Sequence, residues 1–239
     1  MIRKEVPFID IHTHWDSSGW IASAKGLAMT HSSPLFSYGL HPWKVEQPNL
    51  TRLETLLKEN RIAAIGETGL DRIHKDTFEL QLEYFEKHIL LSEQYQKPLI
   101  IHNVKATADI LKLHKKHRPS QTWIIHGFNG TETEVRQLTD KGICLSVGEG
   151  LFFPNRKISQ SIKSIPLESL FLETDTSGKT IQEIYEKASE LLNLKLDLLK
   201  RQIFANFARL NLTPWKTGNN APDCSSATMA LINLDEAMC

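Results

Sequence analysis

Two histidines that are two positions apart follow the first apolar run of the chain. They belong to Asp10-Ile-His12-Thr-His14, directly after Pro7–Ile11. Because alternate residues of an extended strand point to the same side, both imidazoles could bind one cation. A polar strand end with two solvated histidines gives the same pattern, since short His-x-His sequences occur by chance. This segment alone therefore leaves both interpretations open.

Further ionisable residues recur at the ends of later apolar runs: Glu67, His102, His126 and Asp175. Taken singly, each has an ordinary structural interpretation, such as a helix cap, a loop carboxylate or a satisfied core histidine. Taken with the first two histidines, they offer enough nitrogen and oxygen donors for two cations, with one carboxylate as a bridge. Such donors without thiolate suit borderline cations better than Ca²⁺. We therefore expect two divalent metal ions, with Zn²⁺, Mn²⁺ and Mg²⁺ as candidates.

Glu173 has the same strand parity as Asp175, but it precedes it by two residues and should lie deeper. An ion pair or a hydrogen-bond network would satisfy a carboxylate there. His41, after Gly39, could donate to a substrate oxygen near the rim of the site. A structural hydrogen bond at a strand end explains His41 equally well.

Short apolar runs alternate with amphipathic stretches along most of the chain. The runs are Pro7–Ile11, Phe36–Leu40, Ile62–Gly66, Pro98–Ile101, Thr122–Ile125, Ile143–Val147 and Leu170–Leu172. The predicted helices are Asp76–Tyr95, with Asp76 as N-cap, Thr131–Lys141, ending at Gly142, Thr180–Leu192 and Asp197–Leu210. Continuous apolar strands separated by helices predict an α/β fold with a parallel sheet covered on both faces.

The placement of the ionisable residues favours a TIM-like (β/α) barrel over a doubly wound sheet. In a closed barrel, the C-terminal ends of all strands meet at one mouth, whereas an open sheet would scatter several of them. Only seven strand-like runs are visible, and Trp15–Ser37 contains no convincing β-branched run. Either the barrel has seven strands or one short strand is hidden in that segment. We assign the barrel to residues 1–212 and a coil or short helix to 213–239.

Composition narrows the function further. The 239 residues include 28 Lys plus Arg and 28 Asp plus Glu, so the formal net charge is zero. Proteins that grip nucleic acid through their overall field are usually basic. A nucleic-acid substrate would therefore be held by local contacts or by metals.

The three cysteines have no C-x-x-C spacing, and no signal peptide or apolar span is visible. A cytoplasmic enzyme with no membrane and no obligate protein partner is expected.

The set of motifs resembles the TatD family of metal-dependent hydrolases, within the amidohydrolase superfamily. The matching pieces, in order from about Phe8 to Leu210, are Asp-Ile-His12-Thr-His14, Tyr-Gly-Leu-His41-Pro-Trp, Ile-Gly-Glu67-Thr-Gly-Leu-Asp71, Ile-Ile-His102, Ile-His126-Gly-Phe-Asn-Gly, Leu-Glu-Thr-Asp175 and Asn206-Phe-Ala-Arg-Leu. The set is specific as a whole, although each piece alone is only modestly so.

The resemblance implies a TIM-like barrel with a two-metal centre. One cation would be held by His12, His14 and Asp175, the other by His102 and His126, and Glu67 would bridge them. In this arrangement Glu67 fixes the metal separation, and Asp175 also accepts a proton from the attacking water. Family members are described as nucleases that act on DNA ends, and other phosphoester or acyl substrates are proposed for relatives.

The resemblance also bears on how a substrate is held. Many members have an arginine where this chain has Val104, so Lys105 is expected to contact the substrate in its place. Asp71 is expected to orient a metal ligand through a hydrogen bond without binding the metal itself. Basic side chains around the mouth, with Lys105, Arg72 and Lys179 as candidates, would favour a phosphate-containing substrate.

Three functions follow from these expectations. The leading one is hydrolysis of a small phosphoester or of DNA ends, the latter as a 3′–5′ exodeoxyribonuclease. The second is hydrolysis of an amide or ester bond, which a neutral mouth would favour. The third is a metal-stabilised barrel without activity that serves as a binding module. The complete donor set argues against the third, because a degenerate site usually loses a ligand.

Overall fold

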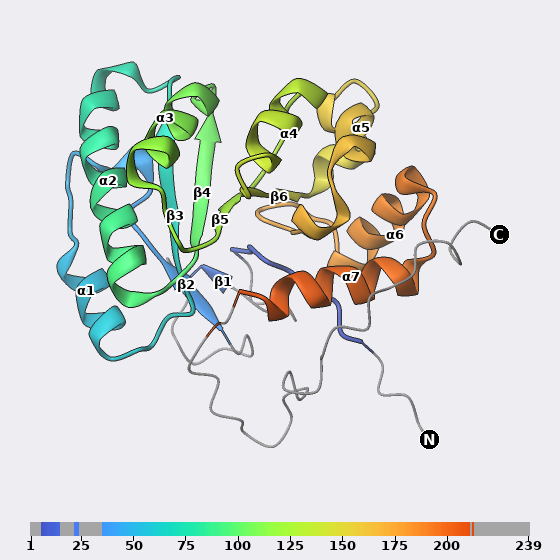
Figure 1. Cartoon of the computed structure of the whole chain (residues 1–239), viewed down its shortest axis with the longest axis horizontal. Coiled ribbons are helices and arrows are strands. Elements are labelled where there is room, and N and C mark those ends of the chain that lie inside the picture. Colours follow the sequence, from blue (N-terminus) through green and yellow to red (C-terminus); the bar gives the residue numbers. More distant parts are fainter. Residues whose placement is uncertain (1–5, 15–21, 24–34, 211, 213–239) are drawn as a thin grey trace.

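The computed structural model describes residues 6–14, 22–23, 35–210 and 212 (Figure 1). Its centre is a seven-stranded parallel sheet in which the strands follow one another in chain order. The strands are β1 (Ala22–Ser23), β2 (Phe36–Tyr38), β3 (Ala64–Asp71), β4 (Leu99–Val104), β5 (Trp123–Ile125), β6 (Cys144–Val147) and β7 (Leu170–Leu172). The tail assigned to 213–239 lies outside the described residues.

The sheet curls until its two sides approach each other. Residues 11–14 run alongside β7, where the amide of Ile11 donates to the carbonyl of Leu172 over 3.1 Å. Thr13 forms a parallel bridge with Asp175 just beyond β7. The His14 ring also lies 3.5 Å from Glu67 on β3, which stands several strands away in the pairing order. This closed path is the curvature that the predicted TIM-like barrel requires.

The number of strands agrees with the sequence, but their membership differs. Pro7–Ile11 forms no named strand, and the two-residue β1 lies instead within Trp15–Ser37. β3 continues past the predicted end at Gly66, so Glu67 lies inside the strand and not after it. The polar residues that seemed to end this run still pair with β4, for example Thr68 with Ile101 after a register shift. A strand end read from hydrophobicity is therefore too early where a barrel buries polar side chains.

Helices cover the strands on the outside of the sheet, and Figure 1 shows α1, α2 and α3 on the side of β3 and β4. The α-helices are α1 (Thr51–Lys58), α2 (Phe78–Tyr95), α3 (Thr107–His117), α4 (Glu132–Thr139), α5 (Lys157–Ser161), α6 (Ile181–Leu192) and α7 (Leu196–Ala208). The short 3₁₀ helices are η1 (Pro42–Lys44), η2 (Lys75–Thr77), η3 (Glu149–Phe152), η4 (Ile162–Ser164) and η5 (Leu167–Ser169). None of the helices in the described part of the chain is long and apolar enough to cross a membrane.

Local sequence accounts for the starts of two of the seven described α-helices. Thr131 and Thr180 each form a capping box with the glutamate three residues later, which fixes the starts of α4 and α6. The predicted end at Gly142 was too late, because α4 ends at Thr139 with Asp140 as its C-cap, and Gly142, with φ +75°, lies two residues beyond that cap. The prediction of Asp76 as an N-cap was wrong, because residues 75–77 form η2 and Thr77 precedes α2. A turn of 3₁₀ helix before an α-helix displaces the cap without changing the sequence pattern.

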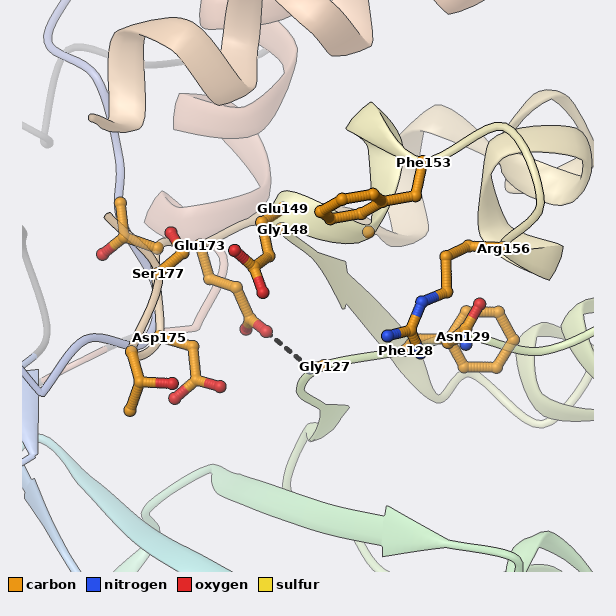
Figure 2. A pocket seen from close by; sticks show the side chains of 13 residues that line it. Gly127, Phe128, Asn129, Gly148, Glu149, Phe153, Arg156, Glu173, Asp175 and Ser177 are labelled. Carbon is orange, nitrogen blue, oxygen red and sulfur yellow. Dashed lines mark hydrogen bonds between the residues drawn. The ribbon is translucent and has the colours of Figure 1, made fainter. Parts of the chain in front are cut away.

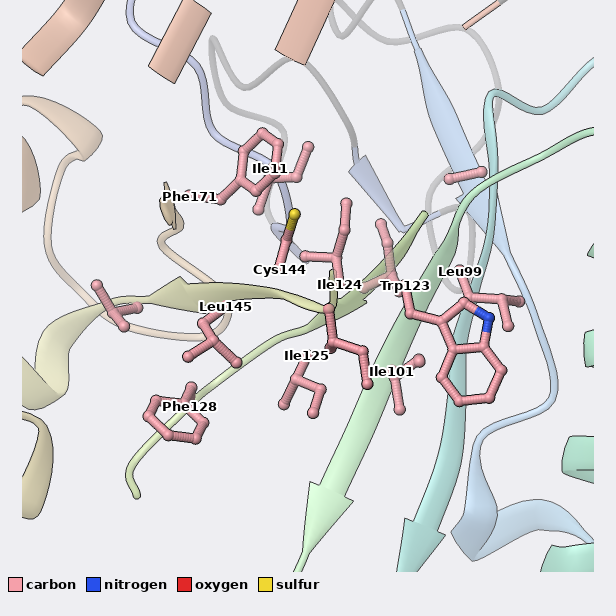
Figure 3. Close-up of a cluster of buried hydrophobic side chains, with 14 of the residues drawn as sticks. Ile11, Leu99, Ile101, Trp123, Ile124, Ile125, Phe128, Cys144, Leu145 and Phe171 are labelled. Atoms are coloured by element: carbon pink, nitrogen blue, oxygen red, sulfur yellow. The ribbon is translucent and has the colours of Figure 1, made fainter. Parts of the chain in front are cut away.

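The core lies on both faces of the strands, as continuous apolar runs require. On β5 all three residues are buried, and Trp123 packs 5.6 Å from Phe85 of α2 between ring centroids. Figure 3 shows buried apolar side chains of β4, β5, β6 and β7 on both sides of the strands, with Cys144 among them. Asn206 of α7 donates to the carbonyls of Leu167 and Leu170, which ties this helix to β7.

A buried histidine joins α2 to the loop that carries His41. The Nε2 atom of His88 accepts a hydrogen bond from the Leu40 amide over 3.0 Å, and its Nδ1 donates to the Tyr84 carbonyl over 2.6 Å. Burial lowers the pKa of His88 to about 4. The ring is therefore neutral at pH 7, as its two hydrogen bonds require.

We expect acid to destabilise the fold through His88. Its folded pKa lies below the unfolded value near 6.5, so stability is full above pH 6.5 and falls as the pH drops towards 4. Between pH 6.5 and pH 5 this group should cost about 2 kcal/mol of unfolding free energy. His88→Gln should therefore show a smaller loss than the wild type in urea denaturation at these two pH values. His74→Gln, at an exposed position, is the control, and an unchanged pH slope in His88→Gln would contradict the prediction.

Candidate metal centre

Glu67 lies at the centre of the converging ionisable side chains. Its Oε1 atom is 2.9 Å from His41 Nε2, 2.8 Å from His102 Nδ1 and 2.9 Å from His126 Nε2. Its Oε2 atom faces a different pair, at 3.5 Å from His14 Nε2 and 3.7 Å from His12 Nε2. The two oxygens of one carboxylate are thus shared between two groups of imidazoles.

Asp175 closes the group around Oε2. Its Oδ1 atom lies 3.4 Å from His14 Nε2 and 3.8 Å from His12 Nε2. Three sets of donor atoms within 4.8 Å of one another could hold a metal ion: His12, His14 and Glu67; His12, His126 and Asp175; and His41, Glu67 and His102. The six side chains that the sequence selected as ligands are therefore together, and His41 is with them.

Backbone geometry explains how these side chains meet. Asp175 adopts φ +50°, a left-handed conformation that aspartate and asparagine tolerate better than most residues. Its amide donates to the His12 carbonyl, and its carbonyl accepts from the His14 amide, which fixes the two segments side by side. On β3, Gly69 has φ +140°, and a Cβ there would overlap the carbonyl oxygen of His102. Glycine therefore lets β3 and β4 come close near Glu67.

The buried charges suit cation binding. His12 is fully buried, and neither ring nitrogen has a hydrogen-bond partner among the described residues. Burial, followed by the charge of His126, lowers the pKa of His12 well below its usual value, so the ring is neutral and one of its two nitrogens has a free lone pair. Burial raises the pKa of Glu67, but His126 and hydrogen bonds from His102 and His126 outweigh burial, and that pKa falls far below the usual range. A neutral imidazole beside an ionised carboxylate is the state that metal ligands need.

Neighbouring charges also shift the pKa values of His126 and Asp175. Burial lowers the pKa of His126, but Glu67 and Glu173 outweigh it and raise that pKa well above its usual value. Burial and the charge of Glu173 raise the pKa of Asp175. The carboxylates that would hold a proton on His126 are also those that would attract a cation.

A second layer of contacts holds these side chains. Asp71 accepts from Trp43 Nε1 over 2.8 Å and lies 3.3 Å from His102 Nε2. Glu173 accepts from the Gly127 amide over 2.5 Å and lies 3.7 Å from His126 Nδ1. Such partners fix ring orientation in metal sites.

The three basic candidates at the mouth differ in their surroundings. Arg72 binds both carboxylate oxygens of Asp109 at 2.6 and 2.7 Å, and Lys179 pairs with Glu183 at 3.0 Å. Lys105 follows β4 with φ +54° and is exposed, and its side chain makes no ion pair within the described residues. Two of the three basic side chains, Arg72 and Lys179, are therefore already neutralised by carboxylates.

Sequence reasoning missed a pocket that opens beside Asp175, between the loops that follow β5, β6 and β7 (Figure 2). Phe153 and Arg156 line it together with Asn129, Glu149 and Glu173. Phe153 and Arg156 lie several residues after the apolar run of β6, in an irregular segment without periodicity. No local pattern marks them, because only the fold brings this loop to the mouth.

Comparison with known proteins identifies the same family that the motifs suggested. A sequence model of the family described as TatD related DNase matches residues 9–211. The metal-dependent hydrolase YjjV of Escherichia coli, itself uncharacterized, is 33% identical over 162 residues, which cover 64% of this chain and 62% of the relative. The deoxyribonuclease Tat-D of Schizosaccharomyces pombe is 27% identical over 169 residues, which cover 64% of this chain and 54% of the relative. The aligned part thus spans less than two thirds of these relatives' length.

Solved structures agree with the predicted fold. The crystal structure of the TatD homologue YjjV from Escherichia coli superposes with a TM-score of 0.75 at 24% identity, covering 85% of this chain and 97% of that chain. A TatD-family hydrolase from Entamoeba histolytica gives 0.71 at 18% identity, covering 86% and 98%. These matches confirm the predicted TIM-like α/β fold. Because the family model spans nearly all of the described residues, the chain belongs to the TatD family of metal-dependent hydrolases.

Proposed function

We propose that this chain hydrolyses phosphodiester bonds at DNA ends with two divalent cations, as a 3′–5′ exodeoxyribonuclease. The observation that carries the proposal is the position of Glu67. Its Oε1 atom faces His102 and His126, and its Oε2 atom faces His12 and His14. A carboxylate shared in this way is suited to bridge two ions. DNA as the substrate is supported by the family description and by the name of the fission-yeast relative.

The proposed ligand sets are those that the family resemblance implies, and these contacts support them. His12, His14 and Asp175 would hold one cation, His102 and His126 the other, and Glu67 would lie between them. The orphaned nitrogens of buried His12 and the absence of thiolate from the set fit Zn²⁺, Mn²⁺ or Mg²⁺. When bound, two such cations supply an activated water at neutral pH and stabilise negative charge on the phosphoryl group.

His41 has a different role in this proposal. Its Nδ1 atom accepts a hydrogen bond from the Trp43 amide over 3.2 Å. The neutral ring therefore carries its proton on Nε2, which here donates to Glu67 Oε1 over 2.9 Å. A protonated nitrogen donates hydrogen bonds and cannot ligate a metal. We therefore assign His41 as a donor to a substrate oxygen, close to the second cation.

Asp175 is the group that accepts a proton in this scheme. It is 35% exposed, whereas His12 is fully buried, so the centre is reached by substrate and water from the Asp175 side. Glu173, 3.7 Å from His126 Nδ1, contributes negative charge beside this ring. Lys105, exposed after β4, remains the proposed contact to a phosphate on that side of the mouth.

A second candidate function is hydrolysis of an amide or ester bond. The observation that favours it is the pairing of Arg72 with Asp109 and of Lys179 with Glu183, which removes two basic side chains from phosphate binding. Related barrels of the amidohydrolase superfamily use similar donor sets, so the chemistry of the centre alone allows both.

The test is a hydrolysis assay on purified chain, stripped with chelator and reloaded with Mn²⁺ or Zn²⁺. Three substrates are compared: end-labelled single-stranded DNA, bis(p-nitrophenyl) phosphate and p-nitrophenyl acetate. We expect cation-dependent shortening of DNA from its 3′ end and cleavage of the phosphodiester. Hydrolysis of the acetate alone would establish the second candidate. Uptake of metal without any hydrolysis would leave a binding module and contradict both.

A further inference from the structure

The pocket beside Asp175 is too large for an ion or a single water. Its volume is about 180 Å³, and its walls come from three successive loops of the barrel mouth. Asp175 is both one of its lining residues and one of the proposed ligands. A group bound here would therefore be continuous with a substrate bound at the metal centre.

The two ends of the pocket have opposite polarity. At the inner end, the Oε2 atom of Glu173 is buried and has no hydrogen-bond partner in the described part of the chain. At the outer end, the exposed Arg156 makes no ion pair or side-chain hydrogen bond with any described residue. Figure 2 shows Arg156 on the far side of the pocket from Asp175, with its guanidinium directed towards Phe128 and Asn129. Glu173 Oε2 at the inner end therefore lacks a hydrogen-bond donor, and Arg156 at the outer end lacks an anion.

An aromatic wall lies between these two ends. Phe153 is 46% exposed, although large apolar side chains are normally covered. Figure 2 shows its ring at the edge of the pocket, near Glu149 and Arg156. An exposed ring beside an arginine is a common way to hold a nucleobase, because every base can stack on it.

We propose that this pocket binds the nucleotide next to the scissile phosphodiester, with its base on Phe153 and its non-scissile phosphate on Arg156. The inference rests on the proposed nuclease function and names the subsite that this function needs. Glu149 and Glu173 repel a phosphate from the inner end, so Arg156 is the side that suits it. Amino or hydroxyl groups of the nucleotide supply the donor that Glu173 Oε2 lacks.

The experiment compares Arg156→Gln and Phe153→Ala with the wild type on two substrates. Single-stranded DNA can fill the pocket, whereas bis(p-nitrophenyl) phosphate has neither a base nor a second phosphate. Each variant should raise KM for DNA roughly tenfold with kcat nearly unchanged, since a stacked base or a charged contact contributes on the order of 1–3 kcal/mol. Turnover of bis(p-nitrophenyl) phosphate should stay unchanged in Arg156→Gln, because this substrate has no second phosphate; Phe153→Ala is assessed on DNA, because the nitrophenyl rings can also contact Phe153. In Arg156→Gln, the salt dependence of DNA binding should also weaken by about 0.7 in log–log slope.

Arg136→Gln is the matched control, because Arg136 is an exposed arginine on α4 whose contact with Glu132 is 3.9 Å. Unchanged KM for DNA in both variants, or equal losses on both substrates, would overturn the subsite. If the wild type cleaves neither substrate, the proposed function is wrong, whatever the variants show. Fluorescence anisotropy of labelled single-stranded DNA then tests the pocket separately, and equal affinity of wild type and Arg156→Gln would reject it.

Discussion

Glu67→Gln is expected to lower kcat/KM for phosphodiester hydrolysis on the order of 10³-fold and to reduce the bound divalent cation by about one equivalent. The substitution keeps the size of the side chain but removes its negative charge. Both oxygens of Glu67 face imidazoles, at 2.8–2.9 Å on one side and 3.5–3.7 Å on the other. A neutral amide has only one oxygen to offer, and its NH₂ group would point at the second set. One of the two cation positions is therefore lost.

The measurements are metal content by mass spectrometry after equilibration with Mn²⁺ or Zn²⁺, and hydrolysis of bis(p-nitrophenyl) phosphate. Glu83→Gln, an exposed glutamate on α2, is the control and should match the wild type in both. Circular dichroism checks that Glu67→Gln keeps its fold. Full metal content together with wild-type turnover in Glu67→Gln would refute the bridging role.

The convergence of the ligands could be predicted from the sequence because it depends on topology. In a parallel barrel every strand delivers its C-terminal end to one mouth, so residues after separate apolar runs must meet there. His126 directly follows β5, and Asp175 lies just beyond β7, as expected. The same reasoning brought His12 and His14 to the site even though their segment forms no named strand. Its backbone still pairs with the end of β7.

Contacts made by side chains of irregular segments could not be predicted. Hydrophobicity places the end of β3 at Gly66, because Glu67 and Thr68 are polar residue types. In the structure both are buried within the strand. The sequence offers Lys105, Arg72 and Lys179 as basic side chains at the mouth, and only the structure shows that Asp109 pairs with Arg72. No sequence pattern points to Arg156, since its position at the mouth depends on the path of a loop.

Asp175→Asn is expected to lower kcat by about 10²- to 10⁴-fold while both cations remain bound. Asparagine tolerates the left-handed backbone of this position, φ +50°, about as well as aspartate does. The backbone hydrogen bonds to His12 and His14 therefore persist, and the amide oxygen still faces the cation site. What disappears is the ability of the side chain to accept a proton from the attacking water. Loss of turnover with metal retained separates this role from that of Glu67, whose replacement removes metal as well.

The measurement pairs single-turnover hydrolysis of DNA with metal content, and Asp140→Asn at an exposed position after α4 serves as the control. If Asp175 only ligates, Asp175→Asn should lose metal and turnover in proportion, and excess Mn²⁺ should restore activity. If Asp175 accepts the proton, excess metal restores nothing, because the missing function is chemical. Turnover equal to that of Asp140→Asn would remove Asp175 from the reaction. Residue 175 would then contribute only its backbone hydrogen bonds to His12 and His14, which the substitution leaves in place.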